Sequence, residues 1–389
     1  MSAVIAGYAR TPFVRFNGQF ATVPAGALGG HAIREALARA GVPAADVDRV
    51  VVGQVLQGGA GQNPARQSAV AAGIPLTVPA ITLNAVCLSG TEAVAAAAAL
   101  IEAGRAEVVV AAGQESMSLA PHVVSARAGT KYGAIELVDS LEHDGLTDAF
   151  EHRSMGASTE AGNGDLAISR AEQDEWAARS HAAAAASAAF LAGEIAPFTI
   201  ESRRGAVVVA ADDGIRADTT PATLAGLRPA FHADGTITAG NSSQITDGAA
   251  ALVLVSPAYA ARHGIAGIAR VESTALVAGP DVRLHAQPAN AIRAALDSLG
   301  EQPAALAAVE INEAFASVVA HSAAVLGVPA DIVNAHGGAI ALGHPIGASG
   351  ARIVGTLARR LAALGSGALG AAGICGGGGQ GSAVVLRVP

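Results

Sequence analysis

The apolar and polar positions of the chain follow the same order in two places, at 32–53 and at 291–312. Each segment begins with the spacing of an amphipathic helix, passes a glycine and a short loop, and ends in an apolar run typical of a buried strand. Each is then followed by a Gly/Ser-rich turn, an alanine-rich helix and another strand. Corresponding positions are separated by the same number of residues throughout: Ala32 and Ala291, Gly41 and Gly300, Val50 and Val309.

This repetition predicts two similar α/β halves; chance similarity in an alanine-rich sequence is the alternative. Helices that alternate with Val-rich strands predict layered packing, with sheets covered on both faces. The segment between the halves holds the single tryptophan, Trp176, and a helix start at Ser169 with a glutamate three residues later. We therefore expect an N-terminal half formed by 1–116 and 246–265, an inserted loop domain at 117–245, and a C-terminal half at 266–389. Such an insertion suits a lid or a substrate-recognition domain.

The composition narrows the class of protein. A chain of 389 residues is too long for one hydrophobic core. The formal charge of −8 argues against a nucleic-acid binder. The longest alanine-rich stretch, at 93–101, is flanked by glutamates and is too short to span a bilayer. The N-terminus has no basic region, and its pattern predicts a strand followed by a turn, not a signal peptide. We therefore expect a soluble, cytoplasmic protein with no membrane partner.

Candidate chemistry lies in three glycine-rich loops. The chain has two cysteines, Cys87 in N-A-V-C-L-S-G and Cys375 in G-I-C-G-G-G-G-Q-G, and His344 lies in G-H-P-I-G-A-S-G. Glycine allows a backbone to approach a ligand closely, because it has no Cβ. Cysteines and a histidine in such loops suggest thiol chemistry, with one sulfur attacking and another moving protons. The spacing matches no zinc site, so we expect no metal, and a disulfide would need an oxidising compartment that nothing in the sequence indicates.

Cys87 and His344 occupy corresponding turns of the two repeats, which predicts that they face one shared cleft. Cys87 precedes a long alanine-rich helix, and the positive end of that helix favours a thiolate. A neighbouring imidazole would favour it further. The alternatives are that Cys87 is a small buried hydrophobe and that His344 is a structural histidine.

The glycines after Cys375 contribute no packing and cost conformational entropy, which fits a loop whose N–H groups line an oxyanion or a thioester. A phosphate loop is the competing interpretation, but no Lys-Ser/Thr follows, and no G-x-G-x-x-G opens a long helix here. Asn312 ends a predicted strand and is either a structural amide or a polarising donor.

Taken together, the motifs resemble those of the thiolase family, in its biosynthetic, acetoacetyl-CoA branch, over essentially the whole chain. The motifs occur in the family's order and are, besides the cysteine turn, A-G-Q-N-P-A-R-Q at 60–67, E-S-M-S-L-A-P-H at 115–122, D-G-L-T-D-A-F at 144–150, L-R-P-A-F at 227–231, T-A-G-N-S-S at 238–243, N-E-A-F-A at 312–316 and G-G-A-I-A-L-G-H-P-I-G-A-S-G at 337–350. The resemblance implies the thiolase fold, with two similar halves in five α-β-α-β-α layers and an inserted loop domain.

The resemblance also implies a reversible condensation of two acetyl-CoA to acetoacetyl-CoA and CoA. Cys87 would be acylated, His344 would draw off its proton, and Cys375 would remove the α-proton of the second acetyl-CoA. The enolate oxygen would lie against His344 and a water held by Asn312. The acyl-enzyme oxyanion would meet the backbone N–H groups of Cys87 and Gly377.

For the coenzyme, the resemblance assigns Ser243 and Arg216 to pantetheine and nucleotide, Met155 to the acyl pocket, and Thr223 and Leu224 to CoA binding. Arg216 is alternatively a solvated surface arginine. CoA thioesters are the implied substrates, with no tightly bound cofactor. A homo-oligomer is implied, either a tetramer built from two dimers or a dimer. The segment 121–133 matches in length the loop that joins dimers in the biosynthetic branch.

Three positions depart from the family pattern. His336 stands where the family commonly has asparagine, the usual G-x-G-P-x-P-A is replaced at 283–289 by a sequence containing Arg283 and His285, and Gln380 is typical of degradative members. A 3-ketoacyl-CoA thiolase of broader chain length is therefore the main alternative. A non-catalytic acyl-CoA or lipid-binding relative would have lost a cysteine or His344, and a decarboxylating condensing enzyme would not need Cys375.

Overall fold

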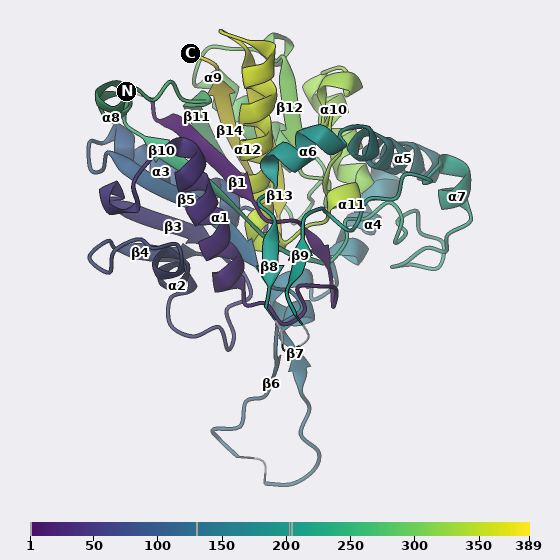
Figure 1. The fold of residues 1–389 in the computed structure, drawn as a ribbon. Helices are drawn as coiled ribbons and strands as arrows, with labels where there is room; N and C mark the ends of the chain where they lie inside the picture. The colour runs from purple at the N-terminus through teal and green to yellow at the C-terminus, as the bar shows by residue number, and fades with distance from the viewer. Residues whose placement is uncertain (1, 130, 202, 204) are drawn as a thin grey trace.

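The protein is described from a computed structural model that places residues 2–129, 131–201, 203 and 205–389. Its main sheet has the strand order β12-β13-β14-β11-β1-β10-β5-β3-β4, and the short β2 pairs with β10 (Figure 1). The strands are β1 (Val4–Arg10), β2 (Val14–Arg15), β3 (Arg49–Gly53), β4 (Ala80–Leu83), β5 (Val108–Glu115), β10 (Thr246–Val255), β11 (Ala269–Ala278), β12 (Ala308–Ile311), β13 (Leu369–Gly376) and β14 (Gln380–Arg387).

The sheet consists of two halves with the same order. In the N-terminal half, β3 is parallel to β4 and to β5, and β10 is antiparallel to β5 and to β1. In the C-terminal half, β12 is parallel to β13, and β14 is antiparallel to β13 and to β11. In the C-terminal half, a parallel bridge between Val309 and Val333 corresponds to the pairing of β3 with β4 in the N-terminal half. The repeat in the sequence therefore reflects a duplicated α/β fold, as predicted.

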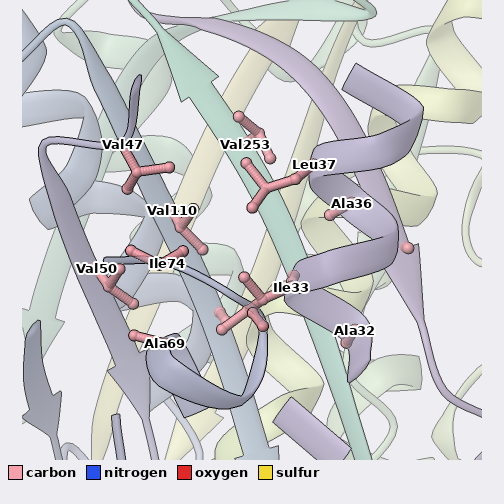
Figure 2. Packing of buried hydrophobic residues seen from close by; sticks show 14 of the residues in the cluster. Ala32, Ile33, Ala36, Leu37, Val47, Val50, Ala69, Ile74, Val110 and Val253 are labelled. Carbon is pink, nitrogen blue, oxygen red and sulfur yellow. The ribbon is translucent and has the colours of Figure 1, made fainter. Parts of the chain in front are cut away.

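Helices cover these halves in five layers. The outer layer of the N-terminal half holds α1 (Ala25–Ala40) and α2 (Pro64–Ala71), and that of the C-terminal half holds α9 (Gln287–Asp297) and α10 (Ala316–Leu326). Between the halves lie α3 (Ser89–Glu102) and α12 (Ile346–Leu364). Strand alternation explains the layers, because successive side chains point to opposite faces. Val50 packs with the outer cluster around Ile33, shown in Figure 2, whereas Val51 packs with α3 and α12.

The central helices α3 and α12 touch at their first turns, where both are built from small residues. A Cβ at Gly90 would overlap the backbone nitrogen of Ala351, and one at Gly350 would overlap that of Thr91. Glycine is therefore required at this crossing. The close approach brings the starts of the two helices together, with Cys87 and His344 each two residues before a helix start.

The segment between β5 and β10 carries its own short elements. They are β6 (His122–Val123), β7 (Val138–Asp139), β8 (Phe198–Ile200), β9 (Val207–Val209), the π-helical turn η2 (Leu141–Leu146), α4 (Met155–Asp165), α5 (Arg170–Ala186), α6 (Ala188–Glu194) and α7 (Pro221–Ala225). The arm that contains β6 and β7 projects from the body of the protein (Figure 1). Ser169 caps α5 as predicted, accepting a hydrogen bond from the Glu172 nitrogen at 3.1 Å.

Buried ion pairs fasten this segment to the N-terminal half. The Arg10 guanidinium on β1 bonds to Glu194 at 2.9 Å and to Asp212 at 2.6 and 2.8 Å, with all three side chains almost fully buried. Each buried charge in this network has an oppositely charged partner. Removing one partner would leave another charge buried and unpaired.

The remaining elements are short: the helices α8 (Pro257–His263) and α11 (Ala339–Leu342) and the 3-10 turns η1 (Ala44–Asp46), η3 (Pro303–Ala305) and η4 (Ala330–Ile332). The turns η1 and η3 lie at corresponding positions of the two halves. None of the helices in the described ranges is both long and apolar enough to cross a bilayer.

Candidate active site

The turn that carries Cys87 is strained and held by side chains. It joins β4 to α3, and its Val86 has a φ of 52°, a left-handed conformation that a β-branched residue rarely adopts. The Val86 nitrogen donates to Asn84 Oδ1 at 2.9 Å, and its carbonyl accepts from Ser89 Oγ at 2.6 Å. Ser89 Oγ also accepts from the Ala85 nitrogen. Strain of this kind costs about 1–3 kcal/mol and persists only where the surroundings fix it, so the turn holds Cys87 in one place.

His344 is buried, and its neighbours determine its tautomer. Its Nδ1 lies 2.6 Å from Ser349 Oγ, and Ser349 in turn donates its single hydrogen to the Pro345 carbonyl at 3.0 Å. The Nδ1 atom must then carry the imidazole hydrogen. This leaves Nε2 unprotonated, where it accepts a long hydrogen bond of 3.5 Å from Asn312 Nδ2. Burial, with a smaller contribution from Arg352, lowers the pKa of His344 to about 3, so the ring is neutral and able to accept a proton.

The tip of the β13–β14 hairpin brings the second thiol to the first. Gly376 packs against Leu88 so closely that a Cβ there would lie 2.7 Å from the Leu88 Cγ. The backbone N–H of Gly377 hydrogen-bonds to the Cys87 sulfur. Cys375 is buried, and its pKa is raised by burial and then by the neighbouring Cys87. The turn that follows is formed by two glycines with φ of 79° and 70°, a conformation that glycine adopts without strain.

The sequence predicted that the start of the following helix would favour a thiolate at Cys87, but in the structure burial has the larger effect on its pKa. Burial raises the pKa of Cys87 to about 12, and the hydrogen bonds from the backbone N–H groups of Gly377 and Cys87 offset only part of this effect. Desolvation thus exceeds the stabilisation from the helix start. Burial therefore favours the neutral thiol form of both cysteines.

A cavity of about 770 Å³ opens beside these loops. Four predicted residues line it: Met155, Arg216, Ser243 and His344. Its wall continues into both thiol neighbourhoods, because Ile346 packs in the cluster that includes Cys87, and Phe315 in the one that includes Cys375. Thr223 and Leu224 lie outside the lining. Thr223 is exposed and completes the capping box of α7, whose N-cap is Thr220, and Leu224 is buried against α5 and α10.

Asn312 leaves one acceptor free beside the imidazole. Its side chain is fully buried, and Oδ1 has no partner among the described residues. A buried amide oxygen without a donor is costly, and an ordered water is the usual remedy. The position next to His344 Nε2 therefore fits a water that, with the imidazole, could face an oxygen of a ligand.

Two positioning groups near His344 were not predicted from the sequence. Ser349 lies in the first turn of α12, and side chains on a helix point back toward the residues that precede them. Its position five residues after His344 could therefore have indicated a contact with the imidazole. Glu115, at the end of β5, accepts from the backbone nitrogens of Val55, Leu56 and Gly347 at 2.9–3.1 Å. Its carboxylate thereby caps α12 from the other half, a long-range contact that no local pattern reveals.

Of the departures from the family pattern, His336 has a packing role. Its ring stacks on Phe190 at 3.8 Å, and its Nδ1 lies 2.7 Å from Ser187 Oγ. It does not line the cavity. In the described part of the chain, no group of three or more His, Cys, Asp or Glu side chains is arranged to hold a metal ion.

Comparison with known proteins agrees with this architecture. Residues 3–258 match the thiolase N-terminal domain, and residues 265–388 match the thiolase C-terminal domain. The chain therefore belongs to the thiolase family.

Relatives are similar over their whole length. The chain is 52% identical to the probable acetyl-CoA acetyltransferase of Mycolicibacterium smegmatis, over 99% of this chain and 100% of that protein. It is 46% identical to the acetyl-CoA acetyltransferase of Rhizobium meliloti, over 99% of this chain and 98% of that one. The crystal structure of the Bacillus anthracis acetyl-CoA acetyltransferase superposes with a TM-score of 0.96 at 37% identity, covering 100% of this chain and 99% of that one.

Proposed function

We propose that the protein is an acetyl-CoA C-acetyltransferase, which condenses two acetyl-CoA to acetoacetyl-CoA and CoA and also runs in reverse. The observation that carries the proposal is that three loops bring three groups together. They are the Gly377 N–H on the Cys87 sulfur, the adjacent Cys375 thiol, and a neutral His344 whose Nε2 carries no proton. The names of the full-length relatives support the same activity.

In the first half-reaction, the Cys87 sulfur attacks the thioester carbonyl as its proton passes to His344 Nε2. The new S–C bond forms, the bond from the acetyl carbon to the CoA sulfur breaks, and that sulfur leaves as a thiol with the proton from the imidazole. Deprotonation has to accompany attack, because burial raises the pKa of Cys87 to about 12. The N–H groups of Gly377 and Cys87 stabilise the negative oxygen of the tetrahedral intermediate.

In the second half-reaction, Cys375 passes its own proton to His344 Nε2 and, as a thiolate, removes a proton from the α-carbon of a second acetyl-CoA. The enolate oxygen is stabilised by the protonated His344 and a water on Asn312, whose Oδ1 is free to hold one. A carbon–carbon bond then forms to the acetyl group on Cys87, and the Cys87–acyl bond breaks. The Cys87 sulfur takes the proton from His344 and Cys375 keeps the proton from the α-carbon, so both cysteines end as thiols.

The cavity is the proposed route for the coenzyme. In this proposal Ser243 meets the pantetheine, Arg216 the nucleotide and Met155 the acyl group, while Thr223 and Leu224 remain predictions. CoA thioesters are the only small molecules this scheme requires. We place the enzyme in the cytoplasm and treat 117–245 as a loop domain inserted in the N-terminal half, which comprises 1–116 and 246–265; residues 266–389 form the C-terminal half.

The acyl group is expected to be short. Met155 overlies the turn of the second thiol, with its sulfur 3.7 Å from where a Cβ of Gly377 would stand, so a bulky side chain lies beside the proposed acyl site. Without a steric limit, each added methylene would favour binding by about 0.8 kcal/mol. We therefore expect kcat/KM for thiolysis to fall at least about tenfold from C4 to C8 3-ketoacyl-CoA. A flat or rising profile from C4 to C12 would instead identify a broad 3-ketoacyl-CoA thiolase.

A homotetramer built from dimers is the proposed assembly. Ile81 on the edge strand β4 is 55% exposed, and the projecting arm exposes Tyr132, Ile135 and Leu137 at 57–99%. Apolar side chains gathered on an edge strand and an arm are typical of surfaces that bind another protein. Light scattering at micromolar concentration is expected to report a tetramer. A stable dimer would remove the tetramer from the proposal, and a monomer would end it.

A further inference from the structure

His285 occupies a buried position between the C-terminal half and the inserted segment. Its side chain is 1% exposed and its Nε2 lies 2.9 Å from Oδ1 of Asn163, on α4. The ring fills the space that a larger residue at position 162 would need, because a Cβ on Gly162 would lie 2.6 Å from the His285 Cε1. On the other side, the His285 carbonyl accepts from Ser322 Oγ on α10 at 2.7 Å.

The tautomer of His285 follows from its partner. Asn163 Nδ2 donates to Thr236 Oγ1 at 3.0 Å, so its Oδ1 is the acceptor and the imidazole hydrogen is on Nε2. The other nitrogen, Nδ1, is buried without a partner among the described residues. Burial, and then the neighbouring His321, lower the pKa of His285 to about 4, which keeps the ring neutral. The contact is therefore a neutral hydrogen bond in a dry interior, where an unmade bond is expensive.

This bond links two elements, here called the two walls, that pack beside Cys375: α4 and the loop at 279–286. Met155 is the first residue of α4, and Asn163 lies two turns further along the same helix. Leu284 immediately precedes His285 and packs with Met155 in the cluster that contains the Cys375 sulfur. If α4 and the loop at 279–286 separated, the bond would break and the imidazole would be left without its acceptor. The two walls therefore keep a fixed spacing beside the reacting sulfur.

We propose that His285 is a positioning residue that limits acyl-chain length, by clamping the loop at 279–286 onto α4 and so holding Leu284 and Met155 against the acyl group. The proposal rests on the proposed function and deepens it: the enzyme accepts acetyl and acetoacetyl thioesters and excludes longer ones because the clamp prevents the walls from separating.

The test measures kcat/KM for thiolysis of C4 and C8 3-ketoacyl-CoA by wild type, His285→Ala, Asn163→Ala and the double variant. Each single variant is expected to raise the C8-to-C4 ratio about tenfold, the scale on which a pocket discriminates small apolar differences. The double variant should add little, since the same bond is lost. A general loss of structure would lower kcat/KM for both substrates together and leave the C8-to-C4 ratio unchanged.

Arg283→Ala is the matched control. Arg283 also joins this loop to α4, through Asp165 at 2.6 Å, but both side chains are about half exposed. Exposed ion pairs contribute little, so the ratio is expected to change less than about threefold.

The outcomes separate the two proposals. If wild type does not thiolyse acetoacetyl-CoA, the proposed function fails. If it does, an unchanged C8-to-C4 ratio in folded His285→Ala and Asn163→Ala overturns the clamp. Should His285→Ala not fold, Asn163→Ala decides alone, because it removes the acceptor and leaves the loop's sequence intact. A wild-type profile that is already flat rejects the short-chain limit and the clamp with it.

Discussion

Cys87→Ser is expected to abolish both acyl transfer and covalent labelling by acetyl-CoA. Burial already raises the pKa of the cysteine thiol to about 12, and a serine hydroxyl is intrinsically far less acidic than a thiol. A neutral imidazole whose own pKa is lowered to about 3 cannot take a proton from that hydroxyl at a useful rate. Serine is close in size and can still accept the Gly377 N–H, so the fold should be retained.

Mass spectrometry after mixing with acetyl-CoA measures this directly. Wild type should carry one acetyl group on Cys87, and the serine variant none. An acetyl group at any position other than 87 in the Cys87→Ser protein would show that Cys87 is not the nucleophile. Stoichiometric acetyl on Cys375 in the variant would exchange the roles that we assign to the two thiols.

The overall fold was predictable because the same pattern of apolar and polar positions occurs twice in the sequence. The same helix, glycine and strand pattern recurs at 32–53 and 291–312, and both copies give a helix, a 3-10 turn and a parallel strand in the structure. The pairing of β1 with β11 at Val4 and Ile5, which joins the halves, has no such signal. It is a contact between distant strands, and the alternation of apolar residues does not specify the partner of a strand.

The candidate catalytic residues were predictable from the sequence because each lies in a glycine-rich turn. Their protonation states were not. A helix start before Ser89 suggested a thiolate, but desolvation depends on everything packed around Cys87, including Ile346 from the other half. Likewise, the tautomer of His344 depends on one hydroxyl, that of Ser349, whose hydrogen is directed to Pro345.

Cys375→Ala is expected to separate the two half-reactions. Cys87 keeps its turn, its Gly377 N–H and its imidazole, so it should still accept one acetyl group from acetyl-CoA. Condensation should fall by about 10²- to 10⁴-fold, the usual contribution of a general acid–base group. Alanine removes only the sulfur from a buried strand end. That sulfur is also a neighbour of the Cys87 thiol.

Two measurements on the same preparation decide this. Mass spectrometry counts acetyl groups on Cys87, and a coupled assay follows acetoacetyl-CoA formation and thiolysis. Burial and the neighbouring Cys87 raise the pKa of Cys375, so it holds its proton in the resting enzyme and has no part in the first attack. Acylation should therefore remain within about threefold of wild type. Equal loss of acylation and condensation would mean that Cys375 supports the structure of the site or shares the role of the nucleophile, and the assignment of separate tasks to the two sulfurs would have to be abandoned.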